Sequence, residues 1–168
     1  TLDFKNEGDS IVLLGTQRND IGSSEYLNKL KGVEFSPAPY FNLEEEFNVQ
    51  QLVARLIKEA KVKSVHDISE GGLMITLLEA AFTTHKGFDV AAQDTNIRKD
   101  AYWLGEAQSR VVVSCSTENI DAIQAAATAA GIGFAVIGKV TNGDVKVAGE
   151  NWGSIADWKN KYDTAIEK

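Results

Sequence analysis

The sequence predicts an α+β fold in which helices pack on a mixed β-sheet. Three observations support this class. The 168 residues are 43% hydrophobic, which is enough for one compact domain with a core. Short apolar segments typical of strands alternate along the chain with longer segments that have a helical period. Near the end, Asn142-Gly143 separates two apolar segments, the pattern of a β-hairpin, so the sheet is not purely parallel.

The first half of the chain contains one clear strand and one clear helix. Residues 10–15, SIVLLG, are a short apolar run, as expected of a buried strand. Asn42 precedes Glu45 by three positions, which is the start signal of a helix. The apolar positions of this helix lie on one face: Val49, Leu52, Val53, Leu56, Ile57 and Ala60. The segment before it contains Pro37 and Pro39 and is expected to be irregular.

The second half alternates more regularly. Strands are predicted at residues 63–67, 88–92 and 110–115, and helices at 73–82 and 118–130, the latter ended by Gly131. Two further strands flank Asn142-Gly143. The last helix begins at Ser154, with Asp157 at the capping position. Its apolar face comprises Ile155, Trp158, Tyr162 and Ile166.

The composition argues against several classes of function. The net charge is −7, from 24 acidic and 17 basic residues without a basic cluster, which argues against a nucleic-acid or membrane partner. Cys115 is the only cysteine, so an intrachain disulfide is excluded and a cytoplasmic location is expected. No apolar run reaches the roughly 20 residues that span a bilayer. The chain begins without Met or a signal peptide, which suggests a piece of a longer chain or a trimmed small protein.

The densest polar stretch is HDISEGGL, residues 66–73, at the predicted junction of a strand and a helix. Gly71 and Gly72 allow a sharp turn, and free backbone N–H groups at a helix start attract phosphate oxygens. Asp67 and Glu70 are hard oxygen ligands of the kind that Mg²⁺ prefers. One interpretation of the stretch is therefore a magnesium-phosphate loop.

The other interpretation of this stretch is structural. Ser69 or Asp67 caps the helix, and His66 is hydrogen-bonded in the core. On these residues alone this second interpretation is the simpler one, because glycine pairs are common before helices.

A second cluster, GEAQSR at residues 105–110, runs into a predicted strand. Glu106, Gln108 and Arg110 alternate, so in an extended backbone their side chains project to one side. A carboxylate, an amide and a guanidinium together can recognise a ribose, an amide or a phosphate. The alternative is a solvated strand edge whose Arg–Glu pair contributes at most about 1 kcal/mol.

A third stretch, residues 13–27, contains Gly15 and Gly22 ahead of Ser23 and Ser24. Either serine is a suitable cap for a following helix. The start of that helix is a second candidate for binding an anion, and an ordinary capped turn is the simpler alternative.

The three motifs occur in a fixed order: GDSIVLLGTQRNDIGSSEYL, then VHDISEGGL with LLEAAF, then GEAQSRVVVS. Together, from Phe4 to about Val140, they resemble the C-terminal domain of phosphoribosylformylglycinamidine synthase, an ATP-dependent enzyme of purine biosynthesis. The expected fold is similar to the C-terminal domain of aminoimidazole ribonucleotide synthetase. The synthase resembles a tandem duplication, and LLG followed by IGSSEYL is similar to its second copy. The resemblance implies that residues 1–168 are a single C-terminal domain of a longer synthase chain.

The resemblance also implies a reaction and its partners. Enzymes of this family phosphorylate the formamide oxygen of formylglycinamide ribonucleotide, and ammonia then displaces the phosphate. The ammonia comes from a glutaminase subunit or domain, assisted by a small bridging subunit. The N-terminal domains of the same chain hold the catalytic histidine and most ligands of ATP. No catalytic residue is therefore assigned here, and the domain alone is expected to be inactive.

Matching by position assigns roles to residues of this sequence. The family's magnesium aspartate corresponds to Asp67, and its substrate-contacting triplet includes Glu106 and Gln108. In the second copy these positions face an auxiliary site, so ATP or ADP with Mg²⁺ is expected there rather than turnover. The predicted nucleotide- or substrate-binding residues are Ser23, Ser24, Ser69, Gly71, Gly72, Glu106, Gln108 and Arg110, and the predicted magnesium ligands are Asp67 and Glu70. Ala107 and Ser23 depart from the family's serine and glycine, which weakens the expected grip on phosphate.

Two other functions remain open. The chain can belong to another ATP-dependent synthetase of the same superfamily, with aminoimidazole ribonucleotide synthetase the nearest. It can also be a non-catalytic domain that binds a ligand or mediates association.

Overall fold

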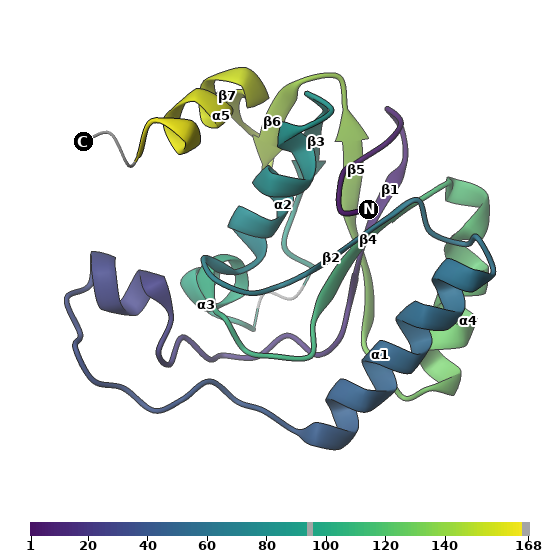
Figure 1. Cartoon of the computed structure of the whole chain (residues 1–168), viewed down its shortest axis with the longest axis horizontal. Helices are drawn as coiled ribbons and strands as arrows, with labels where there is room; N and C mark the ends of the chain where they lie inside the picture. Colours follow the sequence, from purple (N-terminus) through teal and green to yellow (C-terminus); the bar gives the residue numbers. More distant parts are fainter. Residues whose placement is uncertain (94–95, 166–168) are drawn as a thin grey trace.

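A seven-stranded sheet with helices on both faces organises the computed structural model, which describes residues 1–93 and 96–165 (Figure 1). The strands are β1 (Ser10–Leu14), β2 (Ser64–Asp67), β3 (Gly87–Val90), β4 (Val111–Cys115), β5 (Phe134–Thr141), β6 (Asp144–Val147) and β7 (Glu150–Ser154). The helices are α1 (Leu43–Lys58), α2 (Gly72–Phe82), α3 (Lys99–Leu104), α4 (Ile120–Ala129) and α5 (Ile155–Asp163), with short helical turns η1 (Tyr26–Leu30) and η2 (Thr117–Asn119). The predicted α+β class is confirmed.

The sheet is mixed, with the strand order β2-β4-β1-β5-β3-β6-β7. β3 and β6 are parallel, and the other neighbouring pairs are antiparallel. The hairpin predicted at Asn142-Gly143 is wrong: the chain turns there, but β3 lies between β5 and β6 and pairs with both. Gly87 makes this insertion possible, because a Cβ at that position would lie 2.0 Å from the carbonyl oxygen of Asp144. The insertion also buries Phe88 and Val90 in the core.

The hairpin of this region instead joins β6 to β7 through Ala148 and Gly149. Their φ angles of 52° and 83° are the positive values that a two-residue type I′ turn requires. β7 was not predicted, because its sequence ENWGS lacks the apolar alternation of a strand.

The two faces of the sheet carry separate cores. In β1, Ile11 and Leu13 pack with α2, α3 and α5, whereas Val12 and Leu14 pack with α1 and α4. This division follows from the alternation of side chains along a strand. Figure 1 shows the corresponding layers, with α1 and α4 side by side and α2 on the other side of the sheet. In the part of the chain that the structure describes, no helix is long and apolar enough to cross a membrane.

The helix starts follow the predicted capping residues. The side chain of Asn42 accepts hydrogen bonds from the backbone N–H groups of Glu44 and Glu45, at 2.9 and 3.0 Å. Ser154 accepts one from the N–H of Asp157 at 3.2 Å. Both predicted caps are confirmed, whereas Ile166, predicted on the apolar face of the last helix, lies outside the described residues.

The predicted apolar face of α1 is only partly correct. Val49, Leu52 and Leu56 are buried, as expected. Ile57 is 55% exposed and Ala60 is exposed beyond the end of the helix. The apolar stripe that α1 buries is therefore narrower than the sequence suggests, because the face is covered only along the line that meets α4 and the sheet.

Candidate functional site

The three motifs meet at one edge of the sheet. β1 and β2 are both antiparallel to β4, so the segments that follow β1 and β2 lie beside the segment that precedes β4. These segments contain the GSSE loop (residues 22–25), the SEGG loop (residues 69–72) and the GEAQSR loop (residues 105–110). All three loops were identified from the sequence, and in the structure they lie together.

Glu106 connects two of these loops to the third. Its side chain is buried, with 8% of the residue exposed. Its Oε1 atom accepts a hydrogen bond from the N–H of Glu25 at 2.9 Å and another from the N–H of Gly71 at 2.8 Å. A single carboxylate oxygen therefore joins the GSSE loop to the SEGG loop.

The side chain of Arg110 holds the GEAQSR loop in place by hydrogen bonds to the backbone of that loop. Arg110 is 2% exposed, and its guanidinium donates to the carbonyl oxygens of Ala107 and Gly105, at 2.8 and 2.7 Å, and to the side-chain oxygen of Gln17. Burial lowers its pKa to about 10, against the opposing influence of Asp20 and other nearby groups. The guanidinium is thus charged at neutral pH, and it donates its hydrogen bonds to groups of the protein itself.

The predicted extended conformation of the GEAQSR loop is wrong. β4 begins only at Val111, and Ser109 has a φ of 62°, so the preceding residues form a turn. The side chains of Glu106 and Arg110 point inward, whereas Gln108 is exposed. The carboxamide of Gln108 donates to the carbonyl oxygen of Glu106 at 3.1 Å. The three side chains therefore do not share one side, and their role in binding a ligand remains a prediction.

The SEGG loop makes the turn that its glycines predict. Gly71 and Gly72 have φ angles of 79° and 67°, the left-handed region that favours glycine. Their N–H groups are already occupied, by Glu106 Oε1 and by the carbonyl oxygen of Ser69 at 3.0 Å. The expectation of free N–H groups is therefore wrong for these two residues. No side chain caps α2, so the capping role considered for Ser69 or Asp67 is wrong as well.

Asp67, the last residue of β2, and Glu70, in the SEGG loop, have exposed side chains. Two exposed carboxylates fit Mg²⁺, which commonly takes one or two protein carboxylates and completes its shell with water and phosphate. Among the residues that the structure describes, no group of three or more acidic, histidine or cysteine side chains could hold a metal ion. A magnesium ion at these two carboxylates would take its remaining ligands from water or a phosphate.

The two serines of the GSSE loop are used within the protein. Ser24 is fully buried, and its hydroxyl accepts from the N–H of Leu27 at 3.2 Å and donates to the carbonyl oxygen of Ile21 at 2.7 Å. Ser23 has a φ of 50°, and its N–H donates to the hydroxyl of Ser36 at 2.7 Å. This geometry is that of a capped turn, the simpler of the two alternatives for this stretch.

His66 lies at the end of β2 and faces α2. Its Nε2 atom lies 3.5 Å from Oε2 of Glu79, and the other oxygen of this carboxylate, Oε1, accepts a hydrogen bond from the hydroxyl of Tyr162 at 2.7 Å. This bond raises the pKa of Tyr162. Within the described residues, Nδ1 of His66 is buried without a hydrogen-bond partner. Through Glu79, His66 thus links β2 to α2 and α5.

The fold and the loops agree with a known family. Residues 6–150 match the family described as AIR synthase related protein, C-terminal domain. The chain belongs to this family. The match includes all three loops of the candidate site and the strands that present them.

Several curated members of the AIR synthase related family are named phosphoribosylformylglycinamidine synthase subunit PurL. PurL of Caldanaerobacter subterraneus subsp. tengcongensis is 41% identical over 123 residues, which are 73% of this chain and 17% of that protein. PurL of Zymomonas mobilis is 34% identical over 167 residues, 99% of this chain and 22% of that protein. The chain thus spans about a fifth of the length of these relatives.

Solved structures of other proteins share the fold. PurL of T. maritima complexed with FGAR has a TM-score of 0.79 at 15% identity, covering 94% of this chain and 29% of that one. Thiamine-monophosphate kinase from Stenotrophomonas maltophilia has a TM-score of 0.60 at 20% identity, covering 89% of this chain and 52% of that one. These likenesses show the architecture of an AIR synthase related C-terminal domain.

Sequence reasoning did not identify the side chains of Arg18 and Asp20, which lie within the first motif and tie it to the segment around residues 40–45. Asp20 accepts from the N–H groups of Gly22 and Tyr40, at 2.8 and 2.7 Å. Arg18 donates to both oxygens of Glu45 at 2.9 Å, and this bond lowers the pKa of that carboxyl. The contacts with Tyr40 and Glu45 join segments that are 20 and 27 positions apart, so no local pattern indicates them.

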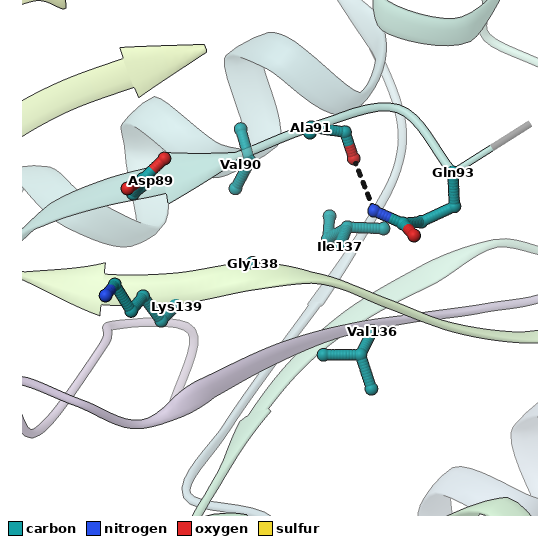
Figure 2. A pocket seen from close by; sticks show the side chains of 8 residues that line it. All are labelled: Asp89, Val90, Ala91, Gln93, Val136, Ile137, Gly138 and Lys139. Atoms are coloured by element: carbon teal, nitrogen blue, oxygen red, sulfur yellow. Dashed lines mark hydrogen bonds between the residues drawn. The ribbon is translucent and has the colours of Figure 1, made fainter. Parts of the chain in front are cut away.

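Two further features of this domain lie apart from the three loops. An open groove of about 360 Å³ lies between β3 and β5, and none of its lining residues belongs to the predicted site (Figure 2). Strands approach closely at Gly138, where a Cβ would lie 2.0 Å from the carbonyl oxygen of Asp89. Cys115 is buried, and burial raises the pKa of its thiol to about 11, which makes it a poor nucleophile at neutral pH.

Proposed function

We propose that this chain is the C-terminal domain of the second repeat of PurL, the ATP-dependent synthase that converts formylglycinamide ribonucleotide to its amidine in purine biosynthesis. The observation that carries the proposal is the 34% identity to Zymomonas mobilis PurL over 99% of this chain. A solved PurL of the same fold is complexed with FGAR, and others are complexed with ATP and ADP. The proposed partners are the N-terminal domains of the same chain, a glutaminase and a small bridging subunit, in the cytoplasm.

In this role the domain contributes a positioned set of loops. Mg²⁺ with its nucleotide would supply the phosphoryl group or an auxiliary anchor when bound. The exposed carboxylates of Asp67 and Glu70 are the groups proposed to hold the metal. The exposed carboxamide of Gln108 is the proposed contact to a nucleotide or substrate. Glu106 and Arg110 act from inside, because they hold the backbone of the loops on which those side chains stand.

The full-length protein that contains this chain is expected to form the amidine from formylglycinamide ribonucleotide, ATP and ammonium ions. Ammonium as the nitrogen source removes the need for a glutaminase. The isolated chain is expected to give no product, because the resemblance assigns the catalytic histidine and most ligands of ATP to the N-terminal domains. Product formation and ADP release are measured in parallel for both proteins.

The assay separates the proposal from its rivals. Amidine formation by the isolated chain would contradict the assignment of catalysis to the N-terminal domains. Turnover by the full-length protein of another substrate alone would favour a different ATP-dependent synthetase of the superfamily. Absence of any ATP-dependent turnover would favour a non-catalytic binding domain.

Replacing Asp67 with alanine is expected to weaken binding of Mg-ADP to the full-length protein about tenfold or more at one site, because the metal loses a charged ligand. Isothermal titration of Mg-ADP, with the other nucleotide sites resolved as separate transitions, measures the change. Asp121→Ala is the matched control, since Asp121 is an exposed carboxylate on α4. Equal affinity in wild type and Asp67→Ala would show that this loop holds no metal.

A further inference from the structure

One buried carboxylate atom holds together segments that are far apart in the chain. Glu25 lies 81 positions before Glu106, and Gly71 lies 35 positions before it. Both backbone N–H groups donate to Oε1 at distances of 2.9 and 2.8 Å, the range of charge-assisted hydrogen bonds. The residue that follows, Ala107, is also buried. Glu106 is therefore an internal anion seated between two backbone donors.

The backbone of Glu106 is fixed independently of its side chain. Arg110 donates to the carbonyl oxygens of Gly105 and Ala107, the residues on either side of Glu106. No ion pair joins the two side chains among the described residues. The guanidinium thus fixes the backbone on both sides of Glu106. The Glu106 carboxylate is left to accept hydrogen bonds from the N–H groups of the two loops.

We infer that Glu106 is the positioning residue of the loop cluster: its negative charge fixes the SEGG loop against the GSSE loop. The inference goes beyond the proposed function and does not rest on it. The neighbouring groups support a role for charge, because the two donors are partial positive charges and Arg110 lies close enough to interact electrostatically with Glu106. The place of Glu70 in space then depends on Glu106, since Glu70 directly precedes the tethered Gly71.

The first test is thermal unfolding of Glu106→Ala and Glu106→Gln in this chain. Loss of two hydrogen bonds to a buried charge is expected to lower the Tm of the alanine variant by about 10 °C. Glutamine keeps an oxygen acceptor but no charge, so its Tm is expected to fall by about half as much. Glu118→Ala, which removes an exposed carboxylate, is expected to leave the Tm within about 1 °C.

The decisive test is rescue by an external carboxylate. Acetate, compared with chloride at equal ionic strength, is expected to raise the Tm of Glu106→Ala by about 3 °C and to leave wild type unchanged. Amide hydrogen exchange gives the local readout: the N–H groups of Glu25 and Gly71 are expected to exchange faster in the alanine variant and to regain protection in acetate. The N–H of Ile68, which donates to the carbonyl oxygen of Arg110 at 3.0 Å, serves as the internal reference.

Three outcomes would overturn the inference. A Glu106→Gln variant as stable as wild type would show that charge is not required, even if Glu106→Ala does not fold. Unchanged exchange at Glu25 and Gly71 in Glu106→Ala would show that other acceptors hold the loops. An acetate effect equal in Glu106→Ala and wild type would show a general solvent effect and no rescue.

Discussion

The Arg110→Met variant is expected to lose about 3 kcal/mol of unfolding free energy, which corresponds to a fall in Tm of about 10 °C. Methionine keeps much of the volume but removes every donor. Two backbone carbonyls then lose their partner in the protein interior, and the half-buried side chain of Gln17 loses its partner as well. Each unpaired buried acceptor costs about 1–3 kcal/mol.

One effect opposes this loss. Burial holds the pKa of Arg110 at about 10 rather than 12.5, so the buried charge itself costs roughly 3 kcal/mol, which its removal returns. The cost of leaving three acceptors unpaired exceeds the free energy regained by removing the buried charge. Glu106 also loses the positive charge beside it. The net effect is therefore destabilising.

Chemical denaturation of Arg110→Met, with Arg98→Met as the control, measures this difference. Arg98 pairs with Asp100 at 2.6 Å, but 63% of its side chain is exposed, so its loss is expected to cost at most about 1 kcal/mol. Arg110→Lys is expected to fall between wild type and methionine, because a lysine cannot reach all three acceptors in a fixed fork. Equal stability of Arg110→Met and wild type would mean that water or other donors satisfy the loop.

The parts of the fold that were predicted correctly are those that local chemistry specifies. Asn42 and Ser154 begin helices because their side chains accept from N–H groups within three residues. The continuous apolar runs of β1 and β4 bury both faces of a central strand pair. Such patterns involve only neighbours in the sequence, so the sequence alone carries them.

The errors concern pairings between distant segments. Asn142-Gly143 is a strong turn signal, and the chain does turn there. The strand that pairs with β5 is not the next one, however, but β3, in which Gly87 lies 54 positions before its partner Thr141. The glycine that permits this insertion, Gly87, has no local pattern that marks it. A turn signal specifies a change of direction, whereas strand order depends on which apolar faces the whole chain can bury.

The candidate site shows the same division. The three loops and their glycines were identified from the sequence, and the structure shows that they meet at one edge of the sheet. The sequence could not show that Glu106 and Arg110 point inward, because alternation along a strand was assumed where Ser109, with a φ of 62°, bends the chain. The same residue types therefore support two roles, ligand contact or internal support, and only the turn decides between them.

Neighbouring residues of α1 provide the sharpest test of burial against sequence pattern. Leu56→Ala is expected to cost about 2–5 kcal/mol, because Leu56 is 1% exposed and packs in the core beneath α1 and α4. Ile57→Ala is expected to change the unfolding free energy by at most about 0.5 kcal/mol, because Ile57 is 55% exposed and alanine favours a helix. Denaturant unfolding of both variants in this chain gives the comparison. The two side chains point about 100° apart around the helix, so equal costs would mean that α1 is rotated from its described position. A cost for Ile57→Ala that arises only in the full-length protein would instead mean that another part of that protein covers this face of α1.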